Sequence, residues 1–289
     1  MRLACIDIGS NTTRLLVADC EPARLAEIHQ QRAFTRLSRG LNAEGTLSEE
    51  KIEEVASVVS EQLRAARALG AASVYALATA AVRRARNGAA LAGVVQRACG
   101  LEVRILSEPE EARLAFVGAA RTLEWEVSGP LGVVDVGGGS SELIVGQPPD
   151  VIGWSRSFAV GSGDLADQFL RSDPPSTAEV DAARAHVAAA FAHVRVPGTA
   201  AAVAVGGSAT SLHRLAGERL DEATFARLFE LLMSARAAEV ARRYALDQER
   251  VRLLPAGLLI LQAAAEVFGA TLRIGRGGIR EGALLEAAS

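Results

Sequence analysis

The sequence predicts an α/β protein built from two similar domains, and three observations support this prediction. The chain has 289 residues, more than one hydrophobic core usually serves. Short apolar runs typical of strands alternate with stretches of helical period. One pattern, an apolar strand that ends in an aspartate followed by small residues, occurs once in each half, at Asp7 and at Asp135. We therefore expect domains at residues 1–123 and 124–289, with the last helix, residues 280–289, packing back on the first domain.

The first half reads as three strands followed by alternating helices and strands. The strands are expected at Arg2–Ile8, Arg14–Asp19, Leu25–Thr35, Val74–Ala78 and Val103–Leu106. Ser48 is a suitable N-cap for a helix that keeps apolar residues at helical spacing as far as Gly70. A second helical stretch is expected between Val74–Ala78 and Val103–Leu106, and a third helix at Glu110–Ala120. The order is therefore β-β-β-α-β-α-β-α.

The second half repeats this order. Strands are expected at Leu131–Val136, Glu142–Val145, Val151–Phe158 and Ala201–Val205, and helices at Leu165–Leu170 and Thr177–His193. The turn-rich segment Ser128-Gly129-Pro130 between the halves is typical of a domain boundary. The apolar run Leu253–Leu261 is about half as long as a membrane span, so it predicts a core helix.

Composition excludes several classes of function. Hydrophobic residues make up 49% and charged residues 22%, which is typical of a globular protein. A net charge of −3 gives no general attraction for nucleic acid or for an anionic membrane, so we expect neither partner. Asp7 interrupts the first apolar stretch too early for a secretory signal, which predicts a cytoplasmic protein. The three cysteines show no C-x-x-C spacing, so neither disulfides nor a zinc site is expected.

The two aspartate-ended strands carry the clearest chemical signal. A buried strand that ends in a carboxylate and turns through small residues presents backbone N–H groups beside a group that can hold a cation. The candidate phosphate-binding residues of the two turns are Gly9, Ser10, Asn11, Gly137, Gly138, Gly139 and Ser140. We interpret the pair as two domains that face each other across a phosphate-binding cleft. The alternative is that one or both turns are merely tight hairpins.

Five segments, in order along nearly the whole chain, resemble a known family. They are Asp7-Ile8-Gly9-Ser10-Asn11, Thr79-Ala80-Ala81-Val82-Arg83, Ser107-Glu108-Pro109-Glu110-Glu111-Ala112-Arg113, Asp135-Val136-Gly137-Gly138-Gly139-Ser140-Ser141-Glu142 and Ile279-Arg280-Glu281-Gly282. Together they resemble the exopolyphosphatase / guanosine pentaphosphate phosphatase (Ppx/GppA) family, in its short form without C-terminal helical domains. The resemblance implies two actin-like (ribonuclease H-like) domains of the sugar kinase/heat-shock ATPase/actin superfamily.

The resemblance also implies a function. Family members are Mg²⁺-dependent phosphohydrolases that release terminal orthophosphate from inorganic polyphosphate or from guanosine pentaphosphate (pppGpp), a nucleotide of the stringent response, and they commonly pair as homodimers. By this resemblance, the expected catalytic residues are Glu111 as general base, Arg83 as a phosphate-binding cation and Asp135 as a Mg²⁺ ligand. Glu142 and Asp7 are expected beside the metal, and Gly206, Gly207 and Ser208 are expected to line the cleft. Arg36 and Arg39 could meet the leaving part of the substrate.

Several alternatives stay open at this stage. Arg83 lies in an arginine-rich run that a solvated helix face would also explain. Glu110 and Glu111 open a helix, where acidic residues interact favourably with the helix dipole, so a capping role is an alternative. Arg250 matches a family position near the cleft, although an exposed helix end would place an arginine there equally well. For the whole protein, the alternatives are an ATP-dependent kinase or ATPase of the same fold and a non-catalytic regulator that binds (p)ppGpp.

Overall fold

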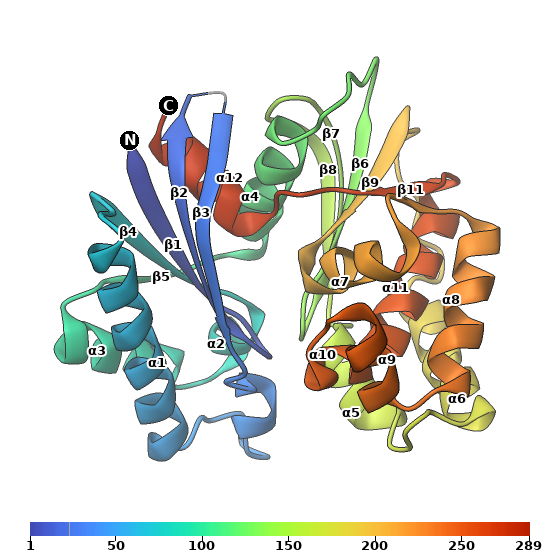
Figure 1. Cartoon of the computed structure of the whole chain (residues 1–289), viewed down its shortest axis with the longest axis horizontal. Helices are drawn as coiled ribbons and strands as arrows, with labels where there is room; N and C mark the ends of the chain where they lie inside the picture. Colours follow the sequence, from blue (N-terminus) through green and yellow to red (C-terminus); the bar gives the residue numbers. More distant parts are fainter. Residues whose placement is uncertain (23) are drawn as a thin grey trace. The chain divides into compact units, whose positions relative to one another are not determined.

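The computed structural model describes residues 1–22 and 24–289 and contains two compact units. Unit 1 comprises residues 1–122 together with residues 277–289, and unit 2 comprises residues 123–276. Figure 1 shows the last helix of the chain, in red, among the elements of unit 1. Each unit has one mixed β-sheet and its own helices, which confirms the α/β prediction.

Unit 1 is built on a five-stranded sheet with the order β3-β2-β1-β4-β5. The strands are β1 (Arg2–Ile8), β2 (Thr13–Glu21), β3 (Arg24–Ala33), β4 (Ser73–Ala78) and β5 (Val103–Ile105). β1, β4 and β5 are parallel, whereas β2 and β3 form an antiparallel meander beside them. The helices are the short 3₁₀ helix η1 (Leu37–Gly40), α1 (Glu49–Ala68), α2 (Ala80–Arg84), α3 (Gly88–Cys99), α4 (Glu108–Arg121) and α12 (Ile279–Ala287).

The side chains of β1 alternate between two different environments. Ile6 and Ile8 are fully buried in an apolar cluster that includes residues of α1 and α3. Asp7 points to the opposite face of the sheet because successive residues of a strand alternate. α12 contacts β1, β2 and β3, and it packs most extensively against α4. The carboxylate of Asp7 therefore lies outside the main apolar cluster of its unit.

Glycines allow α4 and α12 to pack closely. A Cβ on Gly118 of α4 would lie 1.9 Å from the carbonyl oxygen of Gly278, and a Cβ on Gly282 of α12 would lie 2.0 Å from the carbonyl oxygen of Leu114. No side chain fits at either position, because real Cβ contacts are never that short. The backbone of α4, which carries Glu111, is thus held directly by the backbone of α12.

Unit 2 repeats the sheet of unit 1 and extends it by one strand. Its strands are β6 (Leu131–Val136), β7 (Ser141–Gln147), β8 (Val151–Phe158), β9 (Ala201–Val205), β10 (Arg219–Leu220) and β11 (Leu272–Ile274), in the order β10-β11-β9-β6-β7-β8. β6, β9 and β11 are parallel, and β7 and β8 form the antiparallel meander. The repeat expected from the two aspartate-ended strands is therefore present in the folds.

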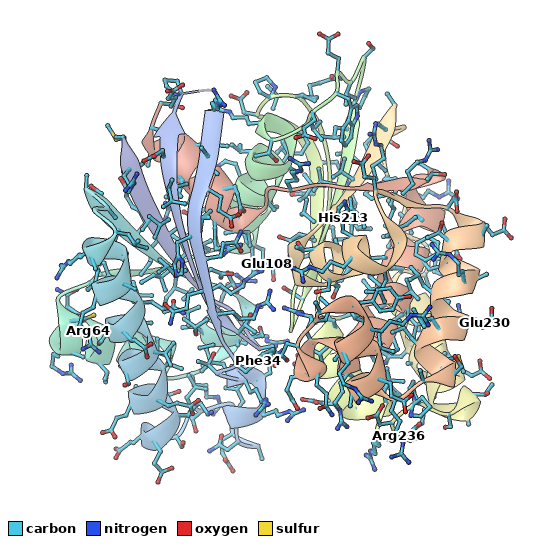
Figure 2. The ribbon with its side chains drawn as sticks, viewed as in Figure 1. Phe34, Arg64, Glu108, His213, Glu230 and Arg236 are labelled. Atoms are coloured by element: carbon cyan, nitrogen blue, oxygen red, sulfur yellow. The ribbon has the colours of Figure 1, made fainter. Side chains whose placement is uncertain are left out.

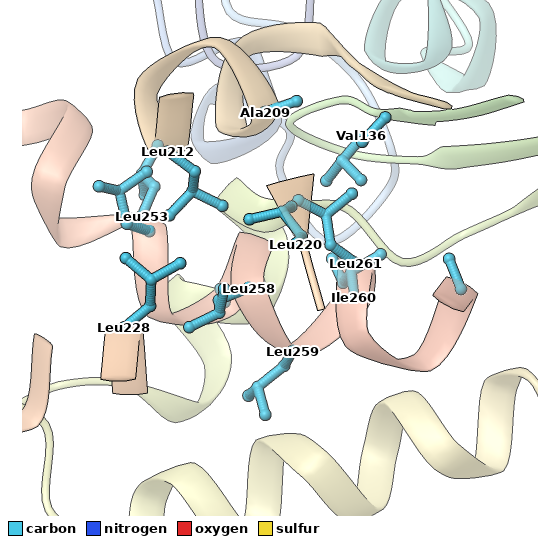
Figure 3. Close-up of a cluster of buried hydrophobic side chains, with 14 of the residues drawn as sticks. Val136, Ala209, Leu212, Leu220, Leu228, Leu253, Leu258, Leu259, Ile260 and Leu261 are labelled. Atoms are coloured by element: carbon cyan, nitrogen blue, oxygen red, sulfur yellow. The ribbon is translucent and has the colours of Figure 1, made fainter. Parts of the chain in front are cut away.

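Helices surround this second sheet, and one of them forms the centre of the core. They are α5 (Ser162–Phe169), α6 (Thr177–Ala190), α7 (Gly206–Ala216), α8 (Glu222–Ser234), α9 (Ala237–Tyr244), α10 (Gln248–Arg252) and α11 (Leu254–Phe268). Figure 3 shows Leu258 to Leu261 of α11 among buried side chains such as Leu212 and Leu228. The predicted core helix is confirmed. Among the described residues, no helix is long and apolar enough to cross a membrane.

The differences between predicted and observed elements lie mainly at their ends. The helix predicted from Glu110 begins at Glu108, because Ser107 supplies the N-cap. The helix predicted to continue to His193 ends at Ala190, and His193 has a positive φ of 61°. All three cysteines are free, and burial raises the pKa of the Cys5 thiol, which makes it unreactive.

Candidate active site

The first aspartate forms a buried ion pair within the β1–β2 hairpin. Asp7 lies directly opposite Arg14 in the antiparallel register, and an Arg14 Nη2 group donates a 2.8 Å hydrogen bond to Asp7 Oδ2. Asp7 is only 3% exposed. Its other oxygen, Oδ1, is buried and has no hydrogen-bond partner in the described part of the chain. The charge of Asp7 is balanced by Arg14, while Oδ1 is left for a water or a ligand.

The turn that follows Asp7 is held rigidly. The N–H of Gly9 donates to the carbonyl of Thr12 at 3.0 Å and closes the turn. The carbonyls of Ser10 and Asn11 accept hydrogen bonds from the N–H groups of Ser38 and Arg36, each at 2.9 Å. The carbonyl side of the turn therefore faces the η1 segment. Because the C=O and N–H of one trans peptide group point in opposite directions, the N–H groups of Asn11 and Thr12 point away from η1.

Glu110 and Glu111, which are adjacent in the first turn of α4, have different environments. Ser107 and Glu110 form a reciprocal capping box, in which the Glu110 carboxylate accepts from the Ser107 N–H at 2.9 Å and from its hydroxyl at 2.7 Å. A hydrogen bond from the Arg104 guanidinium, together with those from Ser107, lowers the pKa of Glu110 to about 2. The capping role thus belongs to Glu110. Glu111, one position later on the helix, is 4% exposed and points into the unit.

Glu111 is paired with Arg83. The Nη1 group of Arg83 lies 2.6 Å from Glu111 Oε2 and also donates a 2.8 Å hydrogen bond to the carbonyl of Leu106. The side chain of Arg83 is 21% exposed and that of Glu111 5%. A solvated helix face therefore does not explain Arg83. The structure brings the predicted base and the predicted phosphate-binding cation into direct contact.

The second aspartate has a different neighbour. In the β6–β7 hairpin, Asp135 lies directly opposite Glu142, and the two residues are 5% and 1% exposed. Side chains of directly opposite residues project from the same face of a sheet, so the two carboxylates lie side by side. Ser157 of β8 donates a 2.8 Å hydrogen bond to Glu142 Oε1. Two adjacent buried carboxylates form an arrangement that a cation stabilises.

The turn after Asp135 is fixed by the first residues of α5. The Gly137 carbonyl accepts from the N–H of Ser162 at 2.9 Å, and the Gly138 carbonyl accepts from Gly163 at 2.9 Å and from Asp164 at 3.0 Å. A Cβ on Gly161 would lie 2.3 Å from the Gly139 nitrogen, so only glycine fits where these two segments meet. As in unit 1, the protein binds the carbonyl side of the turn.

The residues Gly206, Gly207 and Ser208, which were expected to line the cleft, lie in different environments. Gly206 has a φ of +88°, and a Cβ there would lie 2.4 Å from Asp135 Oδ1, so this glycine lies against the carboxylate. The Arg250 guanidinium covers Gly207, and Arg250 is 5% exposed, which excludes an exposed helix end. Ser208 is fully buried, and its hydroxyl faces Gly257 of α11. Of the three loop residues, Gly206 is the one next to the predicted metal ligands.

The carboxylate pair of unit 2 fits the expected magnesium ion. Mg²⁺ in proteins is usually bound by one or two carboxylates and keeps several waters or phosphate oxygens as its other ligands. Asp135 and Glu142 supply two carboxylates, and the absence of a Cβ at Gly206 lets its backbone lie directly against Asp135. Within residues 1–22 and 24–289 there is no group of three or more His, Cys, Asp or Glu side chains arranged for a metal.

Sequence reasoning identified the two aspartates but missed the partner of the first. Arg14 follows Asp7 by seven positions, as Glu142 follows Asp135. The length of the turn fixes which residues of a hairpin lie opposite each other. Two similar hairpins with turns of equal length therefore place residues of equal spacing opposite each other. The spacing is the signal that could have identified Arg14.

Known proteins are similar to this chain over most of its length. The model of the Ppx/GppA phosphatase family matches residues 16–289. "Exopolyphosphatase 1" of Mycobacterium leprae is 28% identical over 305 residues, covering 99% of this chain and 89% of that protein. The "Guanosine-5'-triphosphate,3'-diphosphate pyrophosphatase" of Aeromonas hydrophila is 27% identical over 298 residues, covering 96% of this chain and 58% of that protein.

A solved structure extends the likeness to the fold. The crystal structure of the Ppx/GppA family member of Aquifex aeolicus is 29% identical, with a TM-score of 0.82, and the match covers 99% of this chain and 97% of that one. Its two domains have the actin-like fold, as do the two units described above. The family model spans nearly the whole chain, and the second aspartate-ended hairpin, Leu131–Gln147, lies within the matched residues. The chain belongs to the Ppx/GppA phosphatase family.

Proposed function

We propose that the chain is a Mg²⁺-dependent phosphohydrolase that releases terminal orthophosphate from inorganic polyphosphate or from guanosine pentaphosphate. Family membership and the names of the two relatives support the reaction and its two substrate classes. The observation that carries the proposal is the buried Glu111 held by Arg83. A carboxylate placed in this way is suited to orient and deprotonate an attacking water.

Unit 1 would supply the base and a fixed positive charge. Arg83 uses Nη1 for Glu111 and for the Leu106 carbonyl, which fixes the orientation of both side chains. A guanidinium carries five N–H donors, so Arg83 would bind phosphate oxygens with its other nitrogen atoms. Asp7 would act through Oδ1, which would accept a hydrogen bond from a bound water. The N–H groups of Ser10 and Asn11 would hold phosphate oxygens, whereas that of Gly9 closes the turn by its hydrogen bond to the Thr12 carbonyl.

Unit 2 would hold the metal ion. Asp135 and Glu142 would bind Mg²⁺, and the N–H groups of Gly138, Gly139 and Ser140 would hold phosphate oxygens, whereas the Gly137 N–H closes the turn by its 3.0 Å hydrogen bond to the Ser140 carbonyl. When bound, the ion supplies positive charge that neutralises the phosphoryl oxygens during transfer. The proposal requires that the groups of both units act on the same substrate molecule. Cytoplasmic location and pairing as a homodimer stay predictions.

The test is a comparison of substrates in one assay. Orthophosphate release is measured with Mg²⁺ from short polyphosphate, long polyphosphate, pppGpp and ATP, and again after the metal is removed with a chelator. We expect release from polyphosphate or pppGpp that is lost on chelation. Faster turnover of ATP than of either would indicate a kinase or ATPase, and tight binding of (p)ppGpp without release would indicate a regulator.

A further inference from the structure

One buried ion pair has no role in the mechanism above. Arg280 and Glu281 of α12 belong to the fifth segment of the family resemblance, and each is only 7% exposed. The Nη2 group of Arg280 lies 3.5 Å from Glu281 Oε1. Glu281 Oε2 accepts a 2.8 Å hydrogen bond from the Gly278 N–H and so caps the helix. The cap accounts for the glutamate but not for the arginine.

Helix stability does not account for Arg280. It is the second residue of α12, where the N–H groups of the first turn favour negative charge and disfavour a cation. Burial of a guanidinium is also costly unless hydrogen bonds compensate for the lost water. The reason for its position therefore lies in the contacts that it makes beyond α12.

Those contacts lie on the sheet beside the first aspartate. Arg280 Nη1 donates a 3.2 Å hydrogen bond to the Leu15 carbonyl of β2, and Nη2 donates a 3.3 Å hydrogen bond to Gln30 Oε1 of β3. Leu15 directly follows Arg14, which lies opposite Asp7. The guanidinium therefore joins β2 to β3 one residue away from the Asp7–Arg14 pair.

Charges of both signs gather at this part of the sheet. Burial raises the pKa of the Cys5 thiol, which is also affected by the charges of Asp7, Arg280, Glu281 and Arg14. The group contains two cations and two carboxylates. Loss of Arg280 would leave an excess of negative charge around Asp7.

The same helix also fixes the backbone that carries the proposed base. α12 packs most extensively against α4, and at Gly118 and Gly282 no side chain separates the two backbones. Glu111 lies in the first turn of α4. α12 therefore contacts both elements that carry the proposed water-binding carboxylates of unit 1, β1 for Asp7 and α4 for Glu111.

We propose that Arg280 is a positioning residue for the reaction. Through the Leu15 carbonyl it holds Arg14 against Asp7. Asp7 Oδ1 is thereby placed for the water that Glu111 deprotonates. This inference rests on the proposed function. Because Arg280 touches neither substrate nor metal in this arrangement, its loss should slow the chemical step and leave substrate affinity nearly unchanged.

The experiment is a double-mutant cycle between Arg280 and Arg14. Values of kcat and KM are measured with Mg²⁺ for Arg280→Met and Arg280→Lys, each in the wild type and in an Arg14→Gln background. The substrate is whichever of polyphosphate and pppGpp the wild type hydrolyses. Methionine removes every donor of the guanidinium, whereas lysine keeps the charge but offers one donor group in place of the planar fork.

Two control variants lie elsewhere in unit 1. Arg64→Gln on α1, an exposed arginine labelled in Figure 2, removes one positive charge from the surface. Val95→Ala in α3 removes volume from the apolar cluster, on the face of the sheet opposite Asp7, and so lowers stability alone. Both controls should change kcat less than about twofold.

The expected result is a loss in kcat that depends on Arg14. Arg280→Met should lower kcat about tenfold and Arg280→Lys about threefold, with KM changed less than about twofold. In the Arg14→Gln background, neither substitution should lower kcat further by more than about twofold. Losses that multiply in the double variants, a change confined to KM, or an unchanged kcat would overturn the positioning role. Should Arg280→Met not fold, Arg280→Lys in the two backgrounds decides the question.

Hydrogen exchange gives a readout that does not depend on turnover. Amides of the turn between β1 and β2 should exchange faster in Arg280→Met and Arg280→Lys than in the wild type, while Val95→Ala should leave them nearly unchanged. This result in a protein that releases no phosphate would overturn the proposed function alone. Unchanged exchange in both Arg280 variants would overturn the positioning role, whether or not phosphate is released.

Discussion

The β1–β2 and β6–β7 hairpins are two versions of one structure that differ in the charge of the residue opposite the aspartate. In each, an aspartate near the end of the first strand lies opposite the residue seven positions later, which is Arg14 in unit 1 and Glu142 in unit 2. The first pair is neutral overall, whereas the second carries two negative charges if both groups are ionised. A neutral pair gains little from a cation, while two adjacent carboxylates gain much.

This difference indicates how a repeated fold divides one task. Unit 1 combines its neutral pair with a second ion pair, Arg83–Glu111, and so offers a base and a phosphate-binding cation. Unit 2 offers a site for the metal. The following predictions test this division, beginning with the one that should have the largest effect.

The base of unit 1 should be indispensable. Glu111→Gln keeps the size of the side chain and its hydrogen bond with Arg83 but removes the proton acceptor, so kcat should fall about 10²- to 10⁴-fold. Circular dichroism and thermal unfolding should be nearly unchanged. Glu110→Gln is the matched control, because Glu110 caps the helix, and it should keep nearly full turnover. Near wild-type phosphate release by Glu111→Gln would remove Glu111 from the mechanism.

The cross-strand pairs should separate metal binding from substrate binding. Glu142→Gln should raise the Mg²⁺ concentration needed for half-maximal activity about tenfold or more, because one of two carboxylate ligands is lost. Arg14→Gln should leave that concentration nearly unchanged. Thermal shift gives a second readout, since Mg²⁺ should stabilise the wild type and the Arg14 variant but not the Glu142 variant. Equal effects of the two substitutions would contradict the division between the units.

Unit 1 also depends on a contact made from the far end of the chain. Gly118→Ala places a methyl group against the backbone of Gly278 and should lower the free energy of unfolding by about 1–3 kcal/mol. Gly93→Ala in α3 is the control, because its Cβ would meet only the flexible end of Arg97 at 3.3 Å. That substitution should be neutral or stabilising by up to about 1 kcal/mol, since alanine favours helix. Urea unfolding checks both, and equal stabilities would show that the α4–α12 contact can relax.

Local sequence patterns predicted most of the strands and helices, and they located the two turns that follow Asp7 and Asp135. Four strands coincide with their predicted bounds, because their apolar residues and flanking turns are local signals: Arg2–Ile8, Leu131–Val136, Val151–Phe158 and Ala201–Val205. The packing of Ser208 on α11 and the closeness of α4 to α12 could not be predicted, since both depend on which helices meet. Composition also could not distinguish Glu110 from Glu111, whose different roles follow from the N-cap at Ser107.

The smallest predicted effect compares the helix caps of the two units. Glu110 of unit 1 and Glu179 of unit 2 both belong to capping boxes, and the pKa of each is lowered to about 2. The first cause is a hydrogen bond from Arg104 for Glu110 and one from the Ser172 hydroxyl for Glu179. Because both pKa values are depressed, the stabilisation is complete above about pH 4.5, the ordinary value, and is lost as the pH falls toward 2.

At pH 7, Glu110→Gln and Glu179→Gln should each cost about 1 kcal/mol or less, since both carboxylates are partly exposed. The two losses should respond differently to salt. The Arg104–Glu110 pair is an exposed ion pair, so 1 M NaCl should reduce the loss for Glu110→Gln. Glu179 is stabilised mainly by neutral donors, so its loss should persist. Urea unfolding of the two variants and the wild type at low and high salt measures this difference, and an equal response to salt would show that Arg104 contributes nothing to the cap.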